Sequence, residues 1–203
     1  MTAEEKARRK KIYEKHKPAY DALMAVYPFT LEDLDGEIWA WIRGYEGDYQ
    51  ESTFGRTKSF KYNTPRILKP LFYWDGYLRL ELSKGNKIKN YRVNRLVAET
   101  FIPNPYGKAE VDHRDGCKLN NFVENLRWAT GDENIQYAIE LGLKPVGSEC
   151  PYAAFNDEQI LEIRRIYIKG DLEFGSAALA KKFGVARSTI QRIVTGKTYG
   201  HID

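Results

Sequence analysis

Between Glu110 and Gly142 the sequence reads as two short strands around a polar loop, followed by one helix. The predicted elements are, in order, a strand (Glu110–His113), a loop (Arg114–Glu124), a strand (Asn125–Ala129) and a helix (Gly131–Leu141). Thr130 and Glu133 have the spacing of a capping box at the start of that helix, and Gly142 is a good C-terminal stop. This pattern predicts a small ββα unit and places the chain in the α+β class.

The segments around the ββα unit differ from one another in sequence pattern. Residues 2–27 fit a helix that begins with a Thr2 cap and that Pro18 is expected to break or kink. The Lys/Arg run at 6–11 fits either a phosphate contact or a solvated surface. We expect a modular chain with a basic helical extension (1–35), a small β-rich module (36–90), the ββα domain (91–142), a linker (143–156) and a helical domain (157–203).

The β-rich module is expected to end in a hairpin. Residues 77–82 alternate apolar and polar side chains, as in a half-buried strand, and Gly85-Asn86 suits a two-residue turn into the next strand. Asn94 is then expected to be the N-cap of a short helix over Arg95–Phe101.

Composition excludes several classes of protein. The hydrophobic fraction of 42% and charged fraction of 30% fit a globular chain, and no apolar run approaches the ~20 residues that span a membrane. Cys117 and Cys150 are too few for a disulfide framework or a four-cysteine zinc site. No secretory signal is evident, so we expect a cytoplasmic protein with reduced thiols.

Charge is unevenly distributed along the chain. Residues 36–90 hold ten Lys and Arg against six Asp and Glu, whereas residues 91–142 hold six against eight. An acidic segment beside a basic one fits a cation site within a DNA-binding protein. Random variation of surface charge explains the same counts equally well.

The ββα unit carries residues suited to phosphodiester hydrolysis, which needs a base for water and positive charge beside the phosphate. The imidazole of His113 suits the first task, and a hard divalent cation held by Asp112 and the amide of Asn134 suits the second. Neighbours on a strand point to opposite faces, so the strand must end near His113 for one site to form. Asn125 is placed to brace the loop. Singly, each residue has an ordinary structural explanation; their joint spacing favours the site.

The last segment has the pattern of a helix-turn-helix. Small and apolar residues fall where two helices must approach and turn, at Ala180, Gly184, Val185, Ile190 and Ile193. Ala186 stands where a capping Ser or Thr is usual, which weakens the helix start by roughly 1 kcal/mol. The candidates for DNA contact on the second helix are Arg187, Ser188, Thr189, Gln191 and Arg192. A helical bundle with a solvated basic face is the alternative.

The runs VDHRDGCKLNN (111–121) and ENLRWATGDEN (124–134) resemble the HNH nucleases, specifically the homing endonucleases of phages. The runs at 41–56 and 95–105 are similar to a small module and a helix often found ahead of the nuclease in that family. The resemblance implies that His113 is the general base, that Asp112 and Asn134 ligate one metal, and that Asn125 orients the loop. Arg56 and Arg127 are further candidate DNA contacts. Asn94 departs from the family's usual His, and residues 1–35 match nothing we can place.

The resemblance implies a site-preferring DNA endonuclease that nicks one strand and leaves 5′-phosphate and 3′-hydroxyl ends. Because Asn134 stands where many HNH enzymes have His, one Mg²⁺ or Mn²⁺ per site is expected rather than Zn²⁺. The expected partner is double-stranded DNA, which a monomer of the protein binds. No association with a membrane is expected. The rival hypotheses are a non-catalytic helix-turn-helix regulator and a non-specific toxin or packaging nuclease.

Overall fold

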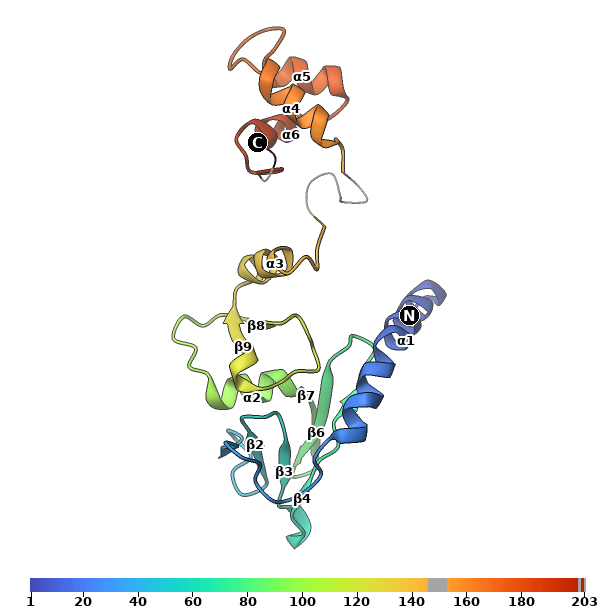
Figure 1. Ribbon diagram of the computed structural model, residues 1–203, viewed down its shortest axis with the longest axis vertical. Helices are drawn as coiled ribbons and strands as arrows, with labels where there is room; N and C mark the ends of the chain where they lie inside the picture. Colours follow the sequence, from blue (N-terminus) through green and yellow to red (C-terminus); the bar gives the residue numbers. More distant parts are fainter. Residues whose placement is uncertain (146–152, 201, 203) are drawn as a thin grey trace. The chain divides into compact units, whose positions relative to one another are not determined.

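The computed structural model describes residues 1–145, 153–200 and 202, and it contains both helices and sheets (Figure 1). The chain forms two compact units, Met1–Leu141 and Gly142–Asp203, which are described separately. Part of the predicted linker at 143–156 lies outside the described residues. In the part of the chain that is described, no helix has the length and apolar character that crossing a membrane requires.

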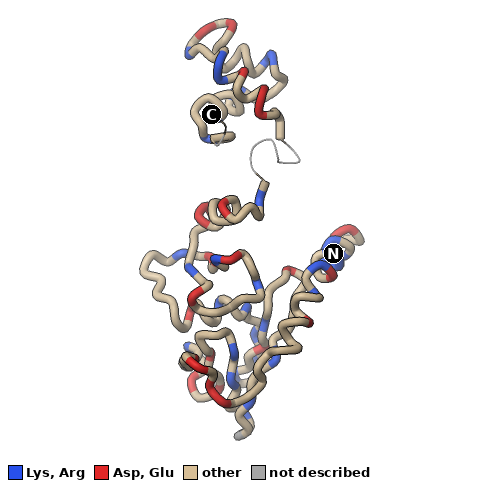
Figure 2. The backbone as a smooth tube through the Cα atoms, viewed as in Figure 1, with Lys and Arg blue, Asp and Glu red and all other residues tan. Residues whose placement is uncertain are grey.

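Helix α1 (Ala3–Val26) opens the first unit, and Figure 2 shows Lys and Arg gathered near its N-terminal end. The Thr2 hydroxyl caps it, as predicted, by accepting a bond of 3.2 Å from the amide three residues on. The helix continues through Pro18, so Pro18 does not break it, and the alternative prediction of a kink stays a prediction. Packing accounts for the continuity of the helix. Tyr20, two residues after Pro18, stacks on Phe72 of the second sheet with ring centroids 5.2 Å apart.

The β-rich module holds a four-stranded antiparallel sheet in sequence order. Its strands are β1 (Trp39–Trp41), β2 (Tyr49–Ser52), β3 (Thr57–Ser59) and β4 (Arg66–Ile67), with a short 3₁₀ helix η1 (Lys61–Asn63) before the last. A tight turn joins β2 to β3, and Gly55 supplies its left-handed backbone with φ +74°.

A second antiparallel sheet follows, made of β5 (Leu71–Phe72), β6 (Leu78–Lys84) and β7 (Lys87–Arg92). The predicted hairpin is confirmed, because Lys84 pairs with Lys87 across Gly85, whose φ is +57°. Alternate leucines along β6 are buried, as the half-buried strand pattern predicted.

Helix α2 (Val93–Phe101) starts directly after β7, and its N-cap is Arg92. Asn94 therefore lies inside the first turn, only 3% exposed, and its Oδ1 has no hydrogen-bond partner. The prediction that Asn94 caps this helix is wrong, because the strand pairing of β7 runs to Arg92 and leaves no room for a separate cap.

The predicted ββα unit is present. Its elements are β8 (Glu110–His113), the 3₁₀ turn η2 (Val123–Asn125), β9 (Leu126–Ala129) and α3 (Gly131–Glu140). Both hydrogen bonds of the Thr130–Glu133 capping box are formed. In the hairpin, Asp112 lies opposite Arg127.

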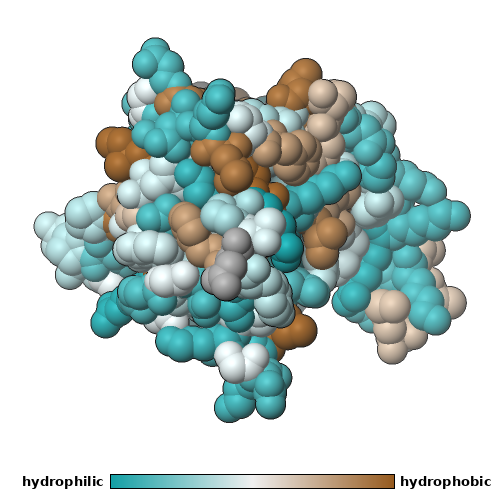
Figure 3. Space-filling model, turned by 90° about the horizontal axis from the view of Figure 1, so that it is seen from below, coloured by the Kyte–Doolittle hydropathy of each residue, from teal (hydrophilic) through white to brown (hydrophobic). Residues whose placement is uncertain are grey.

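One hydrophobic core runs through the first unit. Helix α2 packs against strands of all three sheets, and its Leu96 and Val97 are almost fully buried beside Leu82 of β6, Val111 of β8 and Leu126 of β9. The β-rich module and the ββα unit therefore share a core. Hydrophobic residues left on the outside form separate patches among hydrophilic ones on the face in Figure 3.

The second unit is helical and has its own core. Its helices are α4 (Asp157–Ile166), α5 (Ser176–Phe183) and α6 (Arg187–Val194). Gly184 ends α5 in the left-handed conformation at φ +66°, as a helix-turn-helix requires. Ala186 precedes α6 without a side-chain cap, as predicted.

Candidate active site and DNA-reading surface

Strand β8 separates the candidate site residues onto two faces. Val111 and His113 point into the protein and are 7% and 4% exposed, whereas Glu110 and Asp112 are half-buried on the other face. Asp112 and His113 therefore leave the strand in opposite directions. The strand does end at His113, whose carbonyl accepts a turn bond of 2.9 Å from the Gly116 amide.

The carboxylate face pairs acidic side chains with donors from β9 and α3. Arg127 Nε donates to Asp112 Oδ2 at 2.7 Å, and its guanidinium lies 3.2 Å from the centre of the Tyr137 ring. The side-chain nitrogen of Asn134 donates to Glu110. Within residues 1–145, no hydrogen bond joins Asp112, His113 and Asn134 directly to one another.

The donor chemistry of this face fits one hard divalent cation. Asp112 offers a carboxylate, and the amide of Asn134 uses its nitrogen on Glu110, which leaves its oxygen end for an ion. The ion pair with Arg127 uses Asp112 Oδ2 and offsets its negative charge, so a cation would compete with this guanidinium for Asp112 or share the carboxylate with it. Across the described residues, no three His, Cys, Asp or Glu side chains are grouped to hold a metal, so water or phosphate oxygens would complete the shell.

On the opposite face, Asn121 holds the imidazole of His113. Asn121 Oδ1 lies 3.1 Å from His113 Nε2, and the amide nitrogen of Asn121 donates to the Leu119 carbonyl at 3.3 Å. This assignment of the amide puts the proton on Nε2 and leaves Nδ1 as the basic nitrogen. Burial lowers the pKa of His113 below its usual value, against the opposing hydrogen bond from Asn121, which favours a neutral ring.

Asn125 braces the loop between β8 and β9. Its Oδ1 accepts from the Asp115 amide at 3.1 Å, and its Nδ2 donates to Asp115 Oδ1 and to the Asn120 carbonyl, each at 2.9 Å. Its own carbonyl accepts from the Arg114 amide at 2.8 Å. The side chain thus ties both ends of the loop together, which is the position that the sequence predicted for it.

Asn121 is a candidate site residue that the sequence does not single out. The pair Asn120-Asn121 lies in the run that resembles the family, but nothing in its spacing marks the second amide as the partner of His113. The signal that the sequence does offer is an amide residue in a polar loop after the strand that carries a histidine.

Arg56 is not a DNA contact, and that prediction is wrong. The side chain is 1% exposed, and its guanidinium pairs with the buried carboxylate of Glu37. Its remaining donors bind three carbonyls, those of Pro28, Thr30 and Glu32. Arg56 therefore ties the segment after α1 to the β-rich module, and none of its charge is available to a phosphate.

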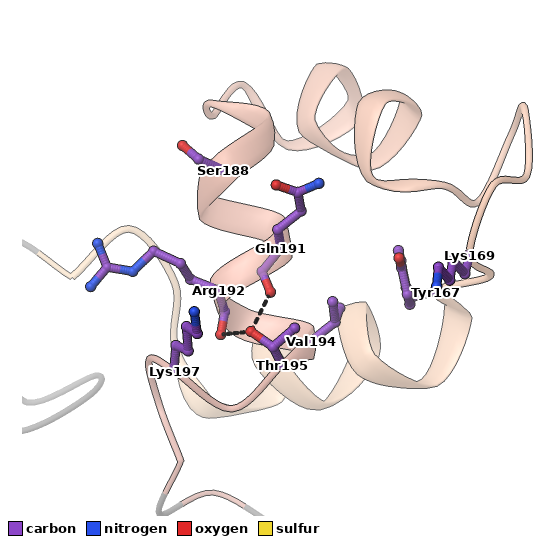
Figure 4. A pocket seen from close by; sticks show the side chains of 8 residues that line it. All are labelled: Tyr167, Lys169, Ser188, Gln191, Arg192, Val194, Thr195 and Lys197. Atoms are coloured by element: carbon purple, nitrogen blue, oxygen red, sulfur yellow. Dashed lines mark hydrogen bonds between the residues drawn. The ribbon is translucent and has the colours of Figure 1, made fainter.

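Helix α6 presents polar side chains at a hollow of about 550 Å³ in the second unit (Figure 4). Ser188, Gln191 and Arg192 line it and are exposed, with Lys169 and Lys197 at its edges. The other two predicted contacts are placed differently.

Arg187 turns back, and its Nε donates to the buried Ser176 Oγ at 3.0 Å. Thr189 is half-buried. Ser188, Gln191 and Arg192 therefore remain the best-placed candidates for base or phosphate contacts on this helix.

Comparisons with known proteins match two regions of the first unit, the β-rich module and the segment that holds the ββα unit. A family model described as HNH endonuclease matches residues 91–136, and the NUMOD4 motif matches residues 37–83. The DNA endonuclease I-HmuI of Bacillus phage SP01 is 34% identical over 165 residues, which are 80% of this chain and 92% of that protein.

Two further matches are also to HNH endonucleases. The H-N-H endonuclease F-TflII of Escherichia phage T5 is 32% identical over 52% of this chain and 55% of its own length. A solved structure of the HNH homing endonuclease I-HmuI matches 78% of this chain and 90% of that chain, with a TM-score of 0.49 and 31% identity. On the identity and coverage of the SP01 relative, together with the matched HNH model, the chain belongs to the HNH homing endonuclease family.

Proposed function

We propose that this protein is a site-preferring DNA endonuclease that nicks one strand of double-stranded DNA by metal-dependent hydrolysis. The observation that carries the proposal is the hairpin itself: a carboxylate and an amide oxygen lie on one face of β8 and α3, and an imidazole hydrogen-bonded to Asn121 lies at the end of the same strand. One such hairpin per chain fits a single cut by a monomer.

Each side chain has a definite task in this proposal. His113 takes a proton from water on Nδ1, while Asn121 keeps Nε2 protonated. Asp112 and Asn134 hold one Mg²⁺ or Mn²⁺, which when bound stabilises charge on the phosphate and on the leaving 3′ oxygen. Asn125 keeps the loop in place, so that these groups need little rearrangement. The products are a 5′-phosphate and a 3′-hydroxyl.

Arg127 and helix α6 are proposed to bind the DNA. Arg127 pairs with Asp112, and its side chain is one quarter exposed, which suits a charge that exchanges its partner for a phosphate. Ser188, Gln191 and Arg192 are proposed to meet the major groove. A non-catalytic regulator is not favoured, because its DNA reader would not need the arrangement of the hairpin.

Supercoiled plasmid carrying the target gives the direct test. With Mg²⁺ present we expect conversion to open circles with ligatable nicks, and no conversion after chelation. His113→Ala should bind the same DNA without nicking it. Plasmid that stays supercoiled with every divalent ion tried would refute the proposed function.

A further inference from the structure

The turn between β2 and β3 of the β-rich module packs against the loop that holds His113. The Val123 amide donates to the Thr53 carbonyl at 2.8 Å. Beside this bond the rings of Phe54 and Phe122 stack with centroids 4.9 Å apart and an interplanar angle of 28°. Two neighbouring residues of the module thus contact two neighbouring residues of the loop.

Gly55 brings the two segments closest together. A Cβ built on Gly55 would lie 2.9 Å from the Asn121 Cβ and 3.2 Å from the Asn121 carbonyl oxygen. The first distance is shorter than real Cβ contacts, and the second is tighter than most of them and is to backbone, which cannot rotate away. The missing side chain of Gly55 is therefore what lets the turn lie directly on Asn121.

The turn is also held from its other side. The hydroxyl of Tyr27, which follows α1, donates to the Gly55 carbonyl at 3.2 Å. Gly55 is thus fixed between Tyr27 and Asn121 and has little room to yield.

Asn121 has two restraints of its own besides this contact. It is 4% exposed, and its amide nitrogen is engaged by the Leu119 carbonyl, so its oxygen is the atom that meets His113 Nε2. A shift of Asn121 would therefore lengthen or break the hydrogen bond to the imidazole of His113.

We propose that the turn Thr53–Gly55 is a working part of the nuclease site: it fixes Asn121, which in turn holds His113 as the tautomer with Nε2 protonated and Nδ1 free for water. Gly55 and Asn121 are positioning residues in this proposal, which rests on the proposed function of His113. The β-rich module then serves catalysis as well as any contact with DNA, and the ββα unit alone is an incomplete enzyme.

Gly55→Ala is the primary variant, and Gly36→Ala is its matched control. Both glycines have φ +74°, so an alanine at either position must adopt a left-handed backbone, but a Cβ at Gly36 meets nothing within 4 Å. Asn121→Leu is the second variant, since it replaces the amide by an apolar side chain of similar size and so removes the acceptor for Nε2. Thermal unfolding of each variant shows whether it still folds.

The first readout is the ¹⁵N spectrum of the histidine rings in the full-length protein without metal or DNA, with the His113 signals assigned from His113→Gln. The wild type and Gly36→Ala should show the Nε2–H tautomer. Gly55→Ala and Asn121→Leu should show a mixture of tautomers. This spectrum does not depend on whether the protein cuts DNA, so its failure sinks the inference and leaves the proposed function standing.

The second readout is plasmid nicking with kcat and KM separated. We expect kcat to fall by about 10- to 100-fold in Gly55→Ala and Asn121→Leu, the range typical of residues that orient a catalytic histidine, with KM unchanged. Gly36→Ala should match the wild type. If Gly55→Ala does not fold, Asn121→Leu decides alone. A folded Asn121→Leu with the wild-type tautomer and kcat would overturn the proposal.

Discussion

The nuclease hairpin and helix α6, the proposed DNA reader, hold their candidate functional side chains in opposite environments. His113 and Asn121 are buried and bonded to each other, and Asn125 makes three side-chain hydrogen bonds within its loop. Ser188 and Gln191 on α6 are exposed at an open hollow (Figure 4). Chemistry needs groups that are in position before the substrate arrives, whereas recognition needs groups that are free to meet it.

This difference predicts separate consequences for mutations in the two regions. A change at His113 or Asp112 in the hairpin should alter the rate of cutting and leave DNA affinity in place. A change on α6 should alter affinity or site choice and leave the rate on bound DNA in place. Variants at His113, Asp112 and Gln191 test that separation, in order of decreasing expected effect, and a variant at Glu51, outside both regions, should have the smallest effect.

His113→Ala should lower the nicking rate by about 10²–10⁴-fold, the usual contribution of a general base. Affinity for target DNA should not change, because the imidazole is buried. Single-turnover nicking and a gel-shift titration on the same preparation measure both quantities. An equal fall in rate and affinity would break the separation between the two regions.

Asp112→Asn should lower the nicking rate by roughly 100-fold or more, since a bound cation contributes several kcal/mol of charge stabilisation. It should also raise the Mn²⁺ concentration needed for half-maximal rate, because one negative ligand is lost. The measurement is rate against ion concentration. Glu124→Gln, an exposed change in the turn η2 of the same ββα unit, is the control and should leave that curve unchanged.

Gln191→Ala should weaken binding to the target by about 1–3 kcal/mol if its amide reads a base edge. Binding to unrelated DNA and the nicking rate at saturating enzyme should stay as in the wild type. Competition titrations with both DNAs give the ratio. Equal weakening on both would show that Gln191 contacts only the backbone.

Glu51→Gln should have the smallest effect, on stability alone. Burial raises the pKa of Glu51 well above its ordinary value, and one of its oxygens has no hydrogen-bond partner. The stability that the protonated acid contributes is present below its unfolded pKa, near 4.5, and is lost as pH rises toward the folded value.

Gln stays neutral throughout, so Glu51→Gln should match the wild type at pH 4 and be more stable at pH 8, by on the order of 1 kcal/mol. Urea unfolding at both pH values measures this. The exposed Glu81→Gln is the control and should show no such pH dependence. A wild type that is relatively more stable at pH 8 would mean that Glu51 is charged and paired in the folded protein.

The sequence predicted the parts of the site that local rules determine. The capping box at Thr130, the stop at Gly142 and the strand that carries His113 all follow from short-range spacing, and the structure has them. The roles of Asp112, Asn125 and Asn134 came from the family resemblance. They remain proposals about chemistry.

The sequence could not predict contacts made across the fold. An arginine after a glycine turn reads the same whether exposed or buried, and Arg56 is buried only because Glu37, 19 residues earlier, folds back onto it. Asn121 bonds the imidazole of His113, eight residues earlier in the chain. It also lies against Gly55, in the turn between two strands of another sheet. Such partners become visible only when the chain is folded.

The most direct test of the central claim is to locate the metal in crystals of the protein with target DNA and Mn²⁺. Anomalous scattering should give one peak, bonded to the Asp112 carboxylate and the Asn134 amide oxygen, with His113 Nδ1 facing a water beside the phosphate. A peak held by other side chains, or His113 facing away from the phosphate, would contradict the account.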